Sequence, residues 1–319
     1  MRSWTSSFLL FSIFLDLLSG SHGDVFRVPT LDVNQKDLFG NNNFLSSTSK
    51  ANYPPFGIDF VDGKATGRFT NGRTQADFIG KDKKINYGSS ACDILPDTGN
   101  FFGTCLTFDK QVDLFETTVK NLQPSFDSKE SMANYLSKSL FFINIGNADV
   151  SIGYDFLDNI TRQKIPFPNF AQAISQKFSN KIRKLYELGA RKFLVSNVGT
   201  MGCSPMIFNL RKSMTTTYDD ETNNRKYLVS NVGTMGCSPM IFEKVLINFK
   251  LVQIQFCCVS AENETRPCIR DIAPCNNRNE HVYFDPFHAS ESSHFILAKR
   301  CLKESSICTP ISLVDLLRA

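Results

Sequence analysis

The segment Asp285-Pro286-Phe287-His288 places a carboxylate three residues before a histidine. In a turn, an aspartate at this spacing can orient the imidazole ring so that it works as a general base. Such a pair is the supporting half of a serine-hydrolase triad, in which the histidine takes a proton from a serine hydroxyl. By itself, the pair is more typical of a surface loop with an incidental hydrogen bond. The remainder of the chain has to decide between these two interpretations.

Further segments, taken in chain order, resemble the plant GDSL esterase/lipase family of secreted SGNH-type hydrolases. They are Gly-Asn-Asn-Asn-Phe at 40–44, Tyr-Pro-Pro-Phe-Gly at 53–57, Gly-Arg-Phe-Thr-Asn-Gly-Arg at 67–73, Ile-Gly-Asn-Ala-Asp at 145–149, Gly-Ala-Arg-Lys-Phe at 189–193, Gly-Cys-Ser-Pro at 202–205 and the segment 285–288. The resemblance implies an α/β domain of the three-layer, flavodoxin-like SGNH hydrolase fold with a parallel sheet. It also implies hydrolysis of carboxylic esters of lipids or small acyl compounds, without a cofactor.

The nucleophile of the resembled family is missing from this chain. In the family, a Gly-Asp-Ser-Leu turn after the first strand supplies the serine, a short distance before the Gly-Asn-Asn-Asn run. Here that run occupies residues 40–43, and no serine occurs between Ser21 and Ser46. Ser46 and Ser47 lie beyond the run, where loop serines are usually turn residues. We therefore identify no nucleophile, and loss of a triad serine lowers turnover by about a millionfold.

The oxyanion donors implied by the resemblance are also altered. The family segment Gly-x-Asn-Asp corresponds to residues 146–149, where Ala148 stands in place of the asparagine donor. One such donor contributes roughly 3 to 4 kcal/mol to transition-state stabilisation. Asn147 can replace it only if the segment is shifted by one residue. The second donor is a backbone N–H, expected at Gly72, with Gly67 as the alternative.

The same resemblance assigns the general base to His288 and the orienting carboxylate to Asp285. His281 and His294 have no carboxylate at the same spacing, so we expect surface or structural roles for them. The segment Ser-Glu-Ser-Ser at 290–293 is typical of a helix start rather than of a nucleophile.

Composition limits the other functional classes. A chain of 319 residues with 42% hydrophobic residues can bury the core of a large α/β domain. Its formal net charge of +4 is small, and positively and negatively charged residues are interspersed, which argues against nucleic-acid binding. The sequence contains no Gly-x-Gly-x-x-Gly loop, P-loop or metal-ligand cluster, so no cofactor or metal is expected.

The first 23 residues are predicted to be a signal peptide. Arg2 precedes an apolar run from Phe8 to Leu18, and small residues follow up to Gly23. The alternative is a membrane anchor, but the run is shorter than the roughly 20 apolar residues that a span requires. We expect residues 24–319 to form the hydrolase-like domain, a monomer without an integral membrane segment, in the extracellular or cell-wall space.

Cysteines and glycan motifs agree with secretion. The chain has ten cysteines, five of which lie between Cys257 and Cys301. In an oxidising compartment these predict disulfides, although the pairing cannot be deduced from sequence. Zinc is the competing interpretation, but a paired C-x-x-C pattern is lacking. Asn159 and Asn263 each begin an Asn-x-Thr glycan acceptor.

The elements that must position these residues follow from hydrophobic periodicity. We predict helices over 127–137, 169–188 and 291–302, with Gly189 ending the second, and buried strands over 140–145 and 193–198. A strand, a helix and a strand in succession imply a right-handed crossover and a parallel sheet. Ligand sites in such sheets lie at the carboxyl ends of the strands, which directs attention to the loops after Ile145 and Val198.

One feature is abnormal for any fold. Residues 191–208 recur as residues 225–242, and the copies differ only where Phe193 becomes Tyr227. Two near-identical copies do not make a solenoid. A recent tandem duplication, or a sequence wrongly assembled from its gene, explains the near-identity. Two functional hypotheses follow. One is a secreted esterase whose true sequence contains the serine turn, and the other is a catalytically silent relative or a decayed gene product.

Overall fold

The computed structural model of this chain describes residues 7–11, 15–17, 41–80, 85–154, 159–196, 205, 253–261, 267–304, 308 and 310–318. The chain divides into two compact units. Unit 1 comprises Met1–Lys50, Ile79–Ser196 and Leu302–Ala319, and unit 2 comprises Ala51–Phe78 and Asn197–Cys301. Each unit has a hydrophobic cluster of its own.

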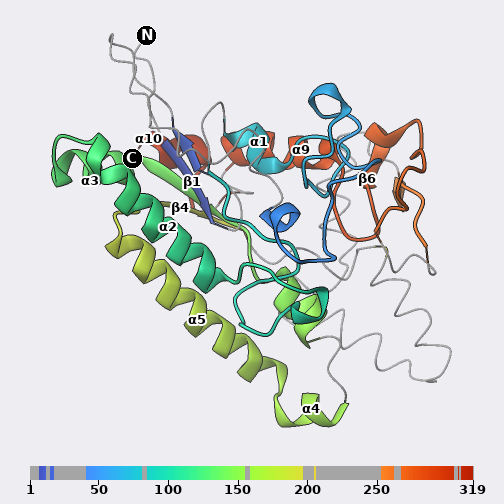
Figure 1. Cartoon of the computed structure of the whole chain (residues 1–319), viewed down its shortest axis with the longest axis horizontal. Helices are drawn as coiled ribbons and strands as arrows, with labels where there is room; N and C mark the ends of the chain where they lie inside the picture. Colours follow the sequence, from blue (N-terminus) through green and yellow to red (C-terminus); the bar gives the residue numbers. More distant parts are fainter. Residues whose placement is uncertain are drawn as a thin grey trace. The chain divides into compact units, whose positions relative to one another are not determined.

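A four-stranded sheet in the order β2-β1-β3-β4 is the centre of unit 1. β1 (Ser7–Phe11) pairs antiparallel with β2 (Leu15–Leu17) and parallel with β3 (Ser139–Ile143). β3 pairs parallel with β4 (Lys192–Val195), and Figure 1 shows the strands side by side. The parallel pairing of β3 with β4 confirms the crossover that the sequence predicts, with strand boundaries shifted toward the N-terminus.

The sequence did not predict β1 and β2, which lie inside the segment assigned to a signal peptide. An apolar run has the composition of a leader and equally that of a parallel strand buried on both faces. In the structure, the backbone of Ser7–Phe11 is in register with all five residues of β3. The signal peptide itself stays a prediction.

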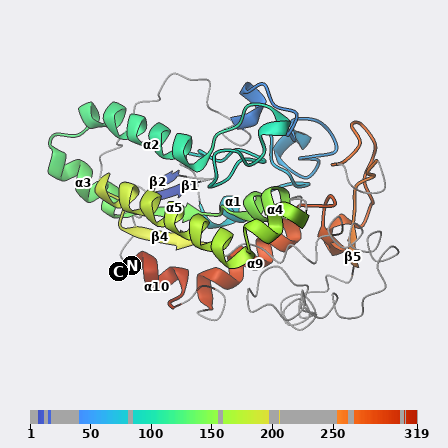
Figure 2. The same cartoon turned by 90° about the horizontal axis from the view of Figure 1, so that it is seen from below.

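Helices cover both faces of this sheet. α2 (Phe108–Leu122) and α5 (Phe167–Glu187) lie beside each other on one face, joined by the ion pairs Lys181–Asp109 and Lys184–Glu116. Figure 2 shows α10 (Leu313–Arg318) on the other side of β4. The Lys192 ammonium on β4 donates to the main-chain oxygen of Leu317 on α10, at 3.0 Å.

Two helices of unit 1 confirm the predicted segments closely. α3 (Lys129–Ser137) begins after Ser128, whose hydroxyl accepts a hydrogen bond from the Ser131 N–H in a capping box. α5 ends where expected, because Gly189 adopts a φ of 112° that most side chains would not allow. The remaining short elements of the unit are α4 (Asn159–Lys164), the π-helical turn Asp149–Tyr154, and the 3-10 turns Asn41–Phe44, Asn100–Phe102 and Gln123–Ser125.

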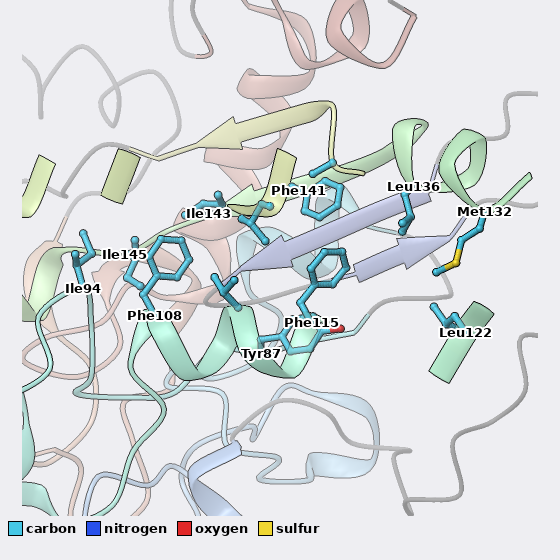
Figure 3. Packing of buried hydrophobic residues seen from close by; sticks show 13 residues of the cluster. Tyr87, Ile94, Phe108, Phe115, Leu122, Met132, Leu136, Phe141, Ile143 and Ile145 are labelled. Carbon is cyan, nitrogen blue, oxygen red and sulfur yellow. The ribbon is translucent and has the colours of Figure 1, made fainter. Parts of the chain in front are cut away.

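Aromatic side chains fill the space between α2 and the sheet. Figure 3 shows Phe108 and Phe115 of α2 in the same cluster as Phe141 and Ile143 of β3. The rings of Phe115 and Phe141 meet edge to face with centroids 5.4 Å apart, and Tyr87 lies 6.1 Å from Phe115. Such ring pairs add to the stabilisation that burial alone provides.

Unit 2 is held together by short strands and disulfides. β5 (Gln253–Phe256) pairs parallel with β6 (His281–Tyr283). Disulfides join Cys257 to Cys275 and Cys258 to Cys268, and all four sulfurs belong to or contact a cluster with Phe56 and Phe284 at its centre. A further disulfide, Cys92–Cys105, lies in unit 1. The expectation of disulfides is thereby confirmed.

Helix α9 (Glu291–Lys303) confirms the predicted closing helix, and its first turn is stabilised by the Ser290 hydroxyl, which accepts from the Ser293 N–H at 3.3 Å. α1 (Gln75–Ile79) and the 3-10 turns Val61–Gly63 and Arg278–Glu280 are the other short elements. Within the described ranges, no helix combines the length and apolar character needed to cross a membrane. The second copy of the repeat, most of the first, Asn263 and residues 18–40 lie outside the described residues.

Truncation of Phe115 tests whether the contact of its ring with Phe141 stabilises unit 1. Phe115 is fully buried, so Phe115→Ala should lower the free energy of unfolding by about 3–5 kcal/mol through lost transfer energy and a residual cavity. Leu114→Ala on the same helix, at a side chain that is 42% exposed, should change it by less than about 1 kcal/mol. Urea unfolding of the whole chain measures both, and equal effects would contradict the packing described.

Candidate active site

Asp285 and His288 form a direct pair in unit 2. The Asp285 side chain is completely buried, whereas that of His288 is 38% exposed. His288 Nδ1 donates to the carboxylate, with Asp285 Oδ2 at 2.8 Å and Oδ1 at 2.9 Å. Since Nδ1 carries the hydrogen of this bond, Nε2 is the ring nitrogen that can accept a proton from a substrate or nucleophile.

The turn geometry that the sequence predicts is present in the backbone as well. Asp285 Oδ1 also accepts from the main-chain N–H groups of Phe287 at 2.8 Å and His288 at 2.6 Å. Asp285 is therefore both the partner of the imidazole and the side chain that folds the turn. A substitution there changes the loop as well as the histidine.

The end of β6 fixes this turn in place. Phe284 follows the strand and is completely buried, and its carbonyl accepts from Cys257 N at 3.1 Å and Cys258 N at 2.9 Å. Its N–H donates to His288 O at 2.9 Å, which closes the turn. The two disulfides that begin at Cys257 and Cys258 thus hold the backbone from which Asp285 projects.

Aromatic rings surround the histidine. The Phe69 ring lies 4.6 Å from the His288 ring, and Phe287 lies 5.9 Å away. Burial and the Asp285 charge raise the pKa of the nearby Tyr53 phenol above its usual value, so this hydroxyl is kept neutral. The pair lies in a largely apolar environment with the negative charge on Asp285.

Gly72 lies directly against the carboxylate of Glu291, a residue that sequence reasoning assigned only to the start of a helix. A Cβ built at Gly72 would lie 2.6 Å from a carboxylate oxygen of Glu291, so only glycine fits without a shift. Glu291 Oε1 accepts from Arg73 N at 3.0 Å, and burial raises the pKa of this carboxyl despite the charge of Arg73. Negative charge at this point opposes an oxyanion, unless Glu291 is protonated or moves.

The alternative donor, Gly67, is already used, since its N–H donates to Ala51 O at 3.1 Å. The 67–73 segment is instead anchored through Asn71. The Asn71 side chain accepts from Glu291 N at 2.8 Å and donates to Asp59 at 2.8 Å. Asp59 in turn forms a two-point ion pair with Arg278 at 2.6 and 2.7 Å. Gly72 thus remains the better prediction for a backbone donor.

Asn147 and Ala148 lie in unit 1, in the loop after β3. The side-chain amide of Asn147 donates to Asn144 Oδ1 at 3.1 Å, and the main-chain carbonyl of Asn147 accepts from the Ser151 hydroxyl at 2.8 Å. This amide would have to leave Asn144 before it could bind an oxyanion. Asn147 as a replacement donor therefore stays a prediction, and the methyl group of Ala148 supplies no donor.

The asparagine run that the sequence singled out has a structural role. Asn42 is buried in unit 1, and its amide donates to Ser49 O at 2.9 Å and Ser90 O at 3.0 Å. The Ser47 hydroxyl accepts from Ser49 N at 3.2 Å, as is usual for a serine in a turn. Ser46 contributes its carbonyl, which accepts from Thr104 N at 2.7 Å.

A metal site is not built from these residues. Within the described part of the chain, one group of three possible ligands comes together, namely Cys257, Cys275 and His281, whose ligand atoms lie within 4.8 Å of one another. Both sulfurs are joined in a disulfide, so neither is a thiolate that could bind an ion.

An open hollow of about 470 Å³ lies beside Gly72. Phe78 and Phe295 meet edge to face there, with ring centroids 5.2 Å apart. The lining residues are Arg73, Phe78, Asn279, Glu291, Ser292, Phe295 and Ile296. This surface combines apolar walls with a few polar groups, as small-molecule sites usually do.

The parallel sheet of unit 1, and in unit 2 the buried aspartate that orients a histidine, fit the α/β protein with an Asp–His pair that the sequence predicts. The chain belongs to the family described as GDSL-like Lipase/Acylhydrolase, whose profile matches residues 40–301. Membership also identifies the fold as the flavodoxin-like α/β fold that the sequence predicts.

Among its relatives, GDSL esterase/lipase At2g04020 of Arabidopsis thaliana is 34% identical, covering 84% of this chain and 82% of the relative. GDSL esterase/lipase At1g71691 from the same plant is 30% identical, covering 96% of each chain. GDSL esterase/lipase 7, also from Arabidopsis thaliana, is 29% identical over 87% of this chain and 88% of the relative. The resemblance read from short segments therefore extends over most of the chain.

His294 provides a pH test of unit 2. Burial lowers the pKa of His294 to about 4, with the charge of His288 acting in the same direction and that of Asp77 against it. In the unfolded chain, histidine titrates near its ordinary value of 6.5. The unfolded state therefore binds the extra proton first, and stability should fall by up to about 1.4 kcal/mol per unit as pH drops from about 6.5 to about 4.

Replacing this imidazole removes the titrating group. His294 Nδ1 is buried and has no hydrogen-bond partner among the described residues, so His294→Gln should flatten the acid limb of stability against pH. The control variant Ser292→Ala, which removes no titratable group, should keep the wild-type slope. Urea unfolding between pH 4 and pH 7 measures the slopes, and an unchanged slope in His294→Gln would contradict burial of the neutral ring.

Proposed function

We propose that this chain is a secreted relative of the carboxylic-ester hydrolases in its family, with the base half of the catalytic machinery intact and the nucleophile lost from the sequence as it stands. The observation that carries the proposal is the Asp285–His288 pair, with Nδ1 of the ring 2.8 Å from the buried carboxylate. Every other part of the proposed chemistry depends on that oriented ring.

In the proposed mechanism, His288 Nε2 takes the proton of a serine hydroxyl as that oxygen attacks the ester carbonyl. Asp285 keeps the ring in the required tautomer and stabilises the imidazolium that forms. The backbone N–H at Gly72 is the proposed donor to the oxyanion, provided that Glu291 withdraws its charge. A serine in the family position is the component that the sequence lacks.

The substrate class follows from the surface beside Gly72. Phe78, Phe295 and Ile296 offer an apolar wall for an acyl group, and the hollow of about 470 Å³ is large enough for a lipid chain segment or a small acyl ester. Arg73 at the same hollow offers a positive charge to a polar head group. We assign no nucleic-acid partner and no cofactor.

A second candidate function has its own support. Two of the family's catalytic features are altered together: the serine turn is absent, and Ala148 replaces an oxyanion donor. A catalytically silent protein that keeps the hollow as a binding site would tolerate both changes, as would the product of a decayed gene. Under this alternative, the Asp285–His288 turn survives because it closes the backbone around Phe284.

Sequencing the native transcript across residues 28–43 and 191–242 separates the candidates. If the sequence has been assembled wrongly from its gene, the transcript encodes a serine turn and one copy of the repeat, and its product hydrolyses p-nitrophenyl butyrate. In that product, His288→Ala should lower turnover by about 10⁴ to 10⁶-fold, because the general base is lost.

The matched control is His294→Gln, which removes a second histidine of the same unit and should leave turnover within a few-fold. The chain as written here should hydrolyse the ester no faster than its own His288→Ala variant. A transcript with the repeat, no serine turn, and a product without His288-dependent hydrolysis would reject the esterase and favour the silent protein.

The proposed location is outside the cell. A predicted leader over residues 1–23, several disulfides and glycan acceptors at Asn159 and Asn263 support a secreted glycoprotein. Amino-terminal sequencing of the purified native protein should therefore begin near Asp24. A protein that begins at Met1 would contradict the leader, and mass spectrometry before and after removal of N-glycans tests the two acceptors.

A further inference from the structure

Unit 1 contains two carboxyl groups that the proposed chemistry does not use. The residue Asp93 is 7% exposed and Asp149 is fully buried. Asp93 lies between the Cys92–Cys105 disulfide and α2, and its carbonyl accepts from Phe108 N, the first residue of that helix, at 2.9 Å. Asp149 begins the π-helical turn that follows the loop after β3. The two carboxyls therefore belong to segments far apart in sequence.

Each carboxyl binds the backbone of the segment that carries the other. Asp93 Oδ2 accepts from the N–H groups of Ala148 and Asp149, the latter at 3.1 Å. Asp149 accepts from Ile94 N at 2.9 Å and from Leu95 N at 3.1 Å. The Thr98 hydroxyl donates to Asp149 Oδ1 at 2.6 Å. Without these acceptors, several buried N–H groups would lose their partners, at a considerable cost in stability.

The segment held in this way is the loop that carries Asn147 and Ala148. Its first end is fixed by β3, whose residues are all buried. Gly146 bends the chain there with a φ of 106°. Its second end is held by Asp93 through Ala148 N and Asp149 N. The reciprocal contacts therefore decide where Asn147, the predicted oxyanion donor, lies relative to the sheet.

We propose that Asp93 and Asp149 are a pair of positioning residues, which clamp the loop 146–149 between β3 and the start of α2. Their importance for ester hydrolysis rests on the proposed function, whereas the clamp itself does not. When the two carboxyls carry at most one charge, the loop is fixed. When both carry a charge, their repulsion in a buried site loosens it.

The charge state of the pair follows from its surroundings. Burial and the neighbouring charge of Asp149 raise the pKa of Asp93 to about 7, against the lowering effect of three backbone N–H groups. Burial also raises the pKa of Asp149, opposed by Thr98, by backbone N–H groups and by Lys177 of α5. Lys177 is the charged side chain that acts on the pair from a packed helix, within the described part of the chain.

The sign of the pH dependence can be worked out. In the unfolded chain, an aspartate loses its proton near pH 3.8, whereas folded Asp93 keeps it until about pH 7. Between these values the folded state binds more protons, so raising the pH favours unfolding. The unfolding equilibrium constant should increase by up to about tenfold per pH unit across this window. His294 acts in the opposite direction, so the pair must be isolated by comparing variants.

The experiment uses the full chain and three substitutions. Asp93→Asn keeps an oxygen acceptor for Ala148 N and Asp149 N but cannot ionise. Its unfolding constant should therefore rise with pH less steeply than that of wild type, by up to about tenfold per pH unit. Asp93→Ala removes the acceptor and should raise the unfolding constant at every pH. Asp113→Asn, at an exposed position on α2, should leave the wild-type pH dependence unchanged.

A local readout separates a clamp from general stability. Hydrogen exchange by mass spectrometry follows the peptide over residues 144–150 at pH 8, above the pKa of Asp93. Wild type should exchange there faster than Asp93→Asn, with equal exchange in a distant peptide of α5. Equal slopes in urea unfolding for wild type and Asp93→Asn, or equal exchange in the loop peptide, would overturn the proposal. No ester is needed in either measurement, so a failure of the proposed function leaves the result interpretable.

Discussion

Complete burial of β3 is the constraint on which unit 1 depends. All five of its residues are inaccessible, so apolar side chains project from both faces of the strand. A strand without a solvent-facing side requires helices on each face, and α2 with α5 on one side and α10 on the other meet this requirement. The loop 146–149 leaves β3 from this fixed strand. The proposed clamp by Asp93 and Asp149 acts on the other end of that loop.

Unit 2 solves a similar problem with covalent bonds instead of a large sheet. Its two described strands are short, and its cluster is built on Phe56, Phe284 and disulfide sulfur. Asp285 has to stay buried while it accepts several hydrogen bonds, which demands a backbone that does not open. The disulfides at Cys257 and Cys258 meet that demand next to the turn, where a small core alone would give little stability.

Local patterns predicted much of this arrangement. The helical spacing of apolar residues and Gly189 located α5, the aromatic run located β3, and the spacing of Asp285 and His288 predicted their contact. These features depend on residues that are neighbours in sequence. Nothing local indicated that Glu291 lies over Gly72, or that Asp93 and Asp149 each bind the backbone of the other's segment, because these contacts join segments that are distant along the chain. The apolar run before residue 18 was ambiguous for a different reason, since export and sheet formation favour the same composition.

That ambiguity has a consequence for the finished protein. Proteolytic removal of residues 1–23 would take away β1 and β2 together, and of the described sheet only β3 and β4 would remain. The freed side of β3 would then display a row of unpaired backbone groups flanked by apolar side chains, which is a template for adding a strand from another molecule. If the predicted leader is cut away, the same five-residue strand therefore decides whether this edge of β3 is paired or open.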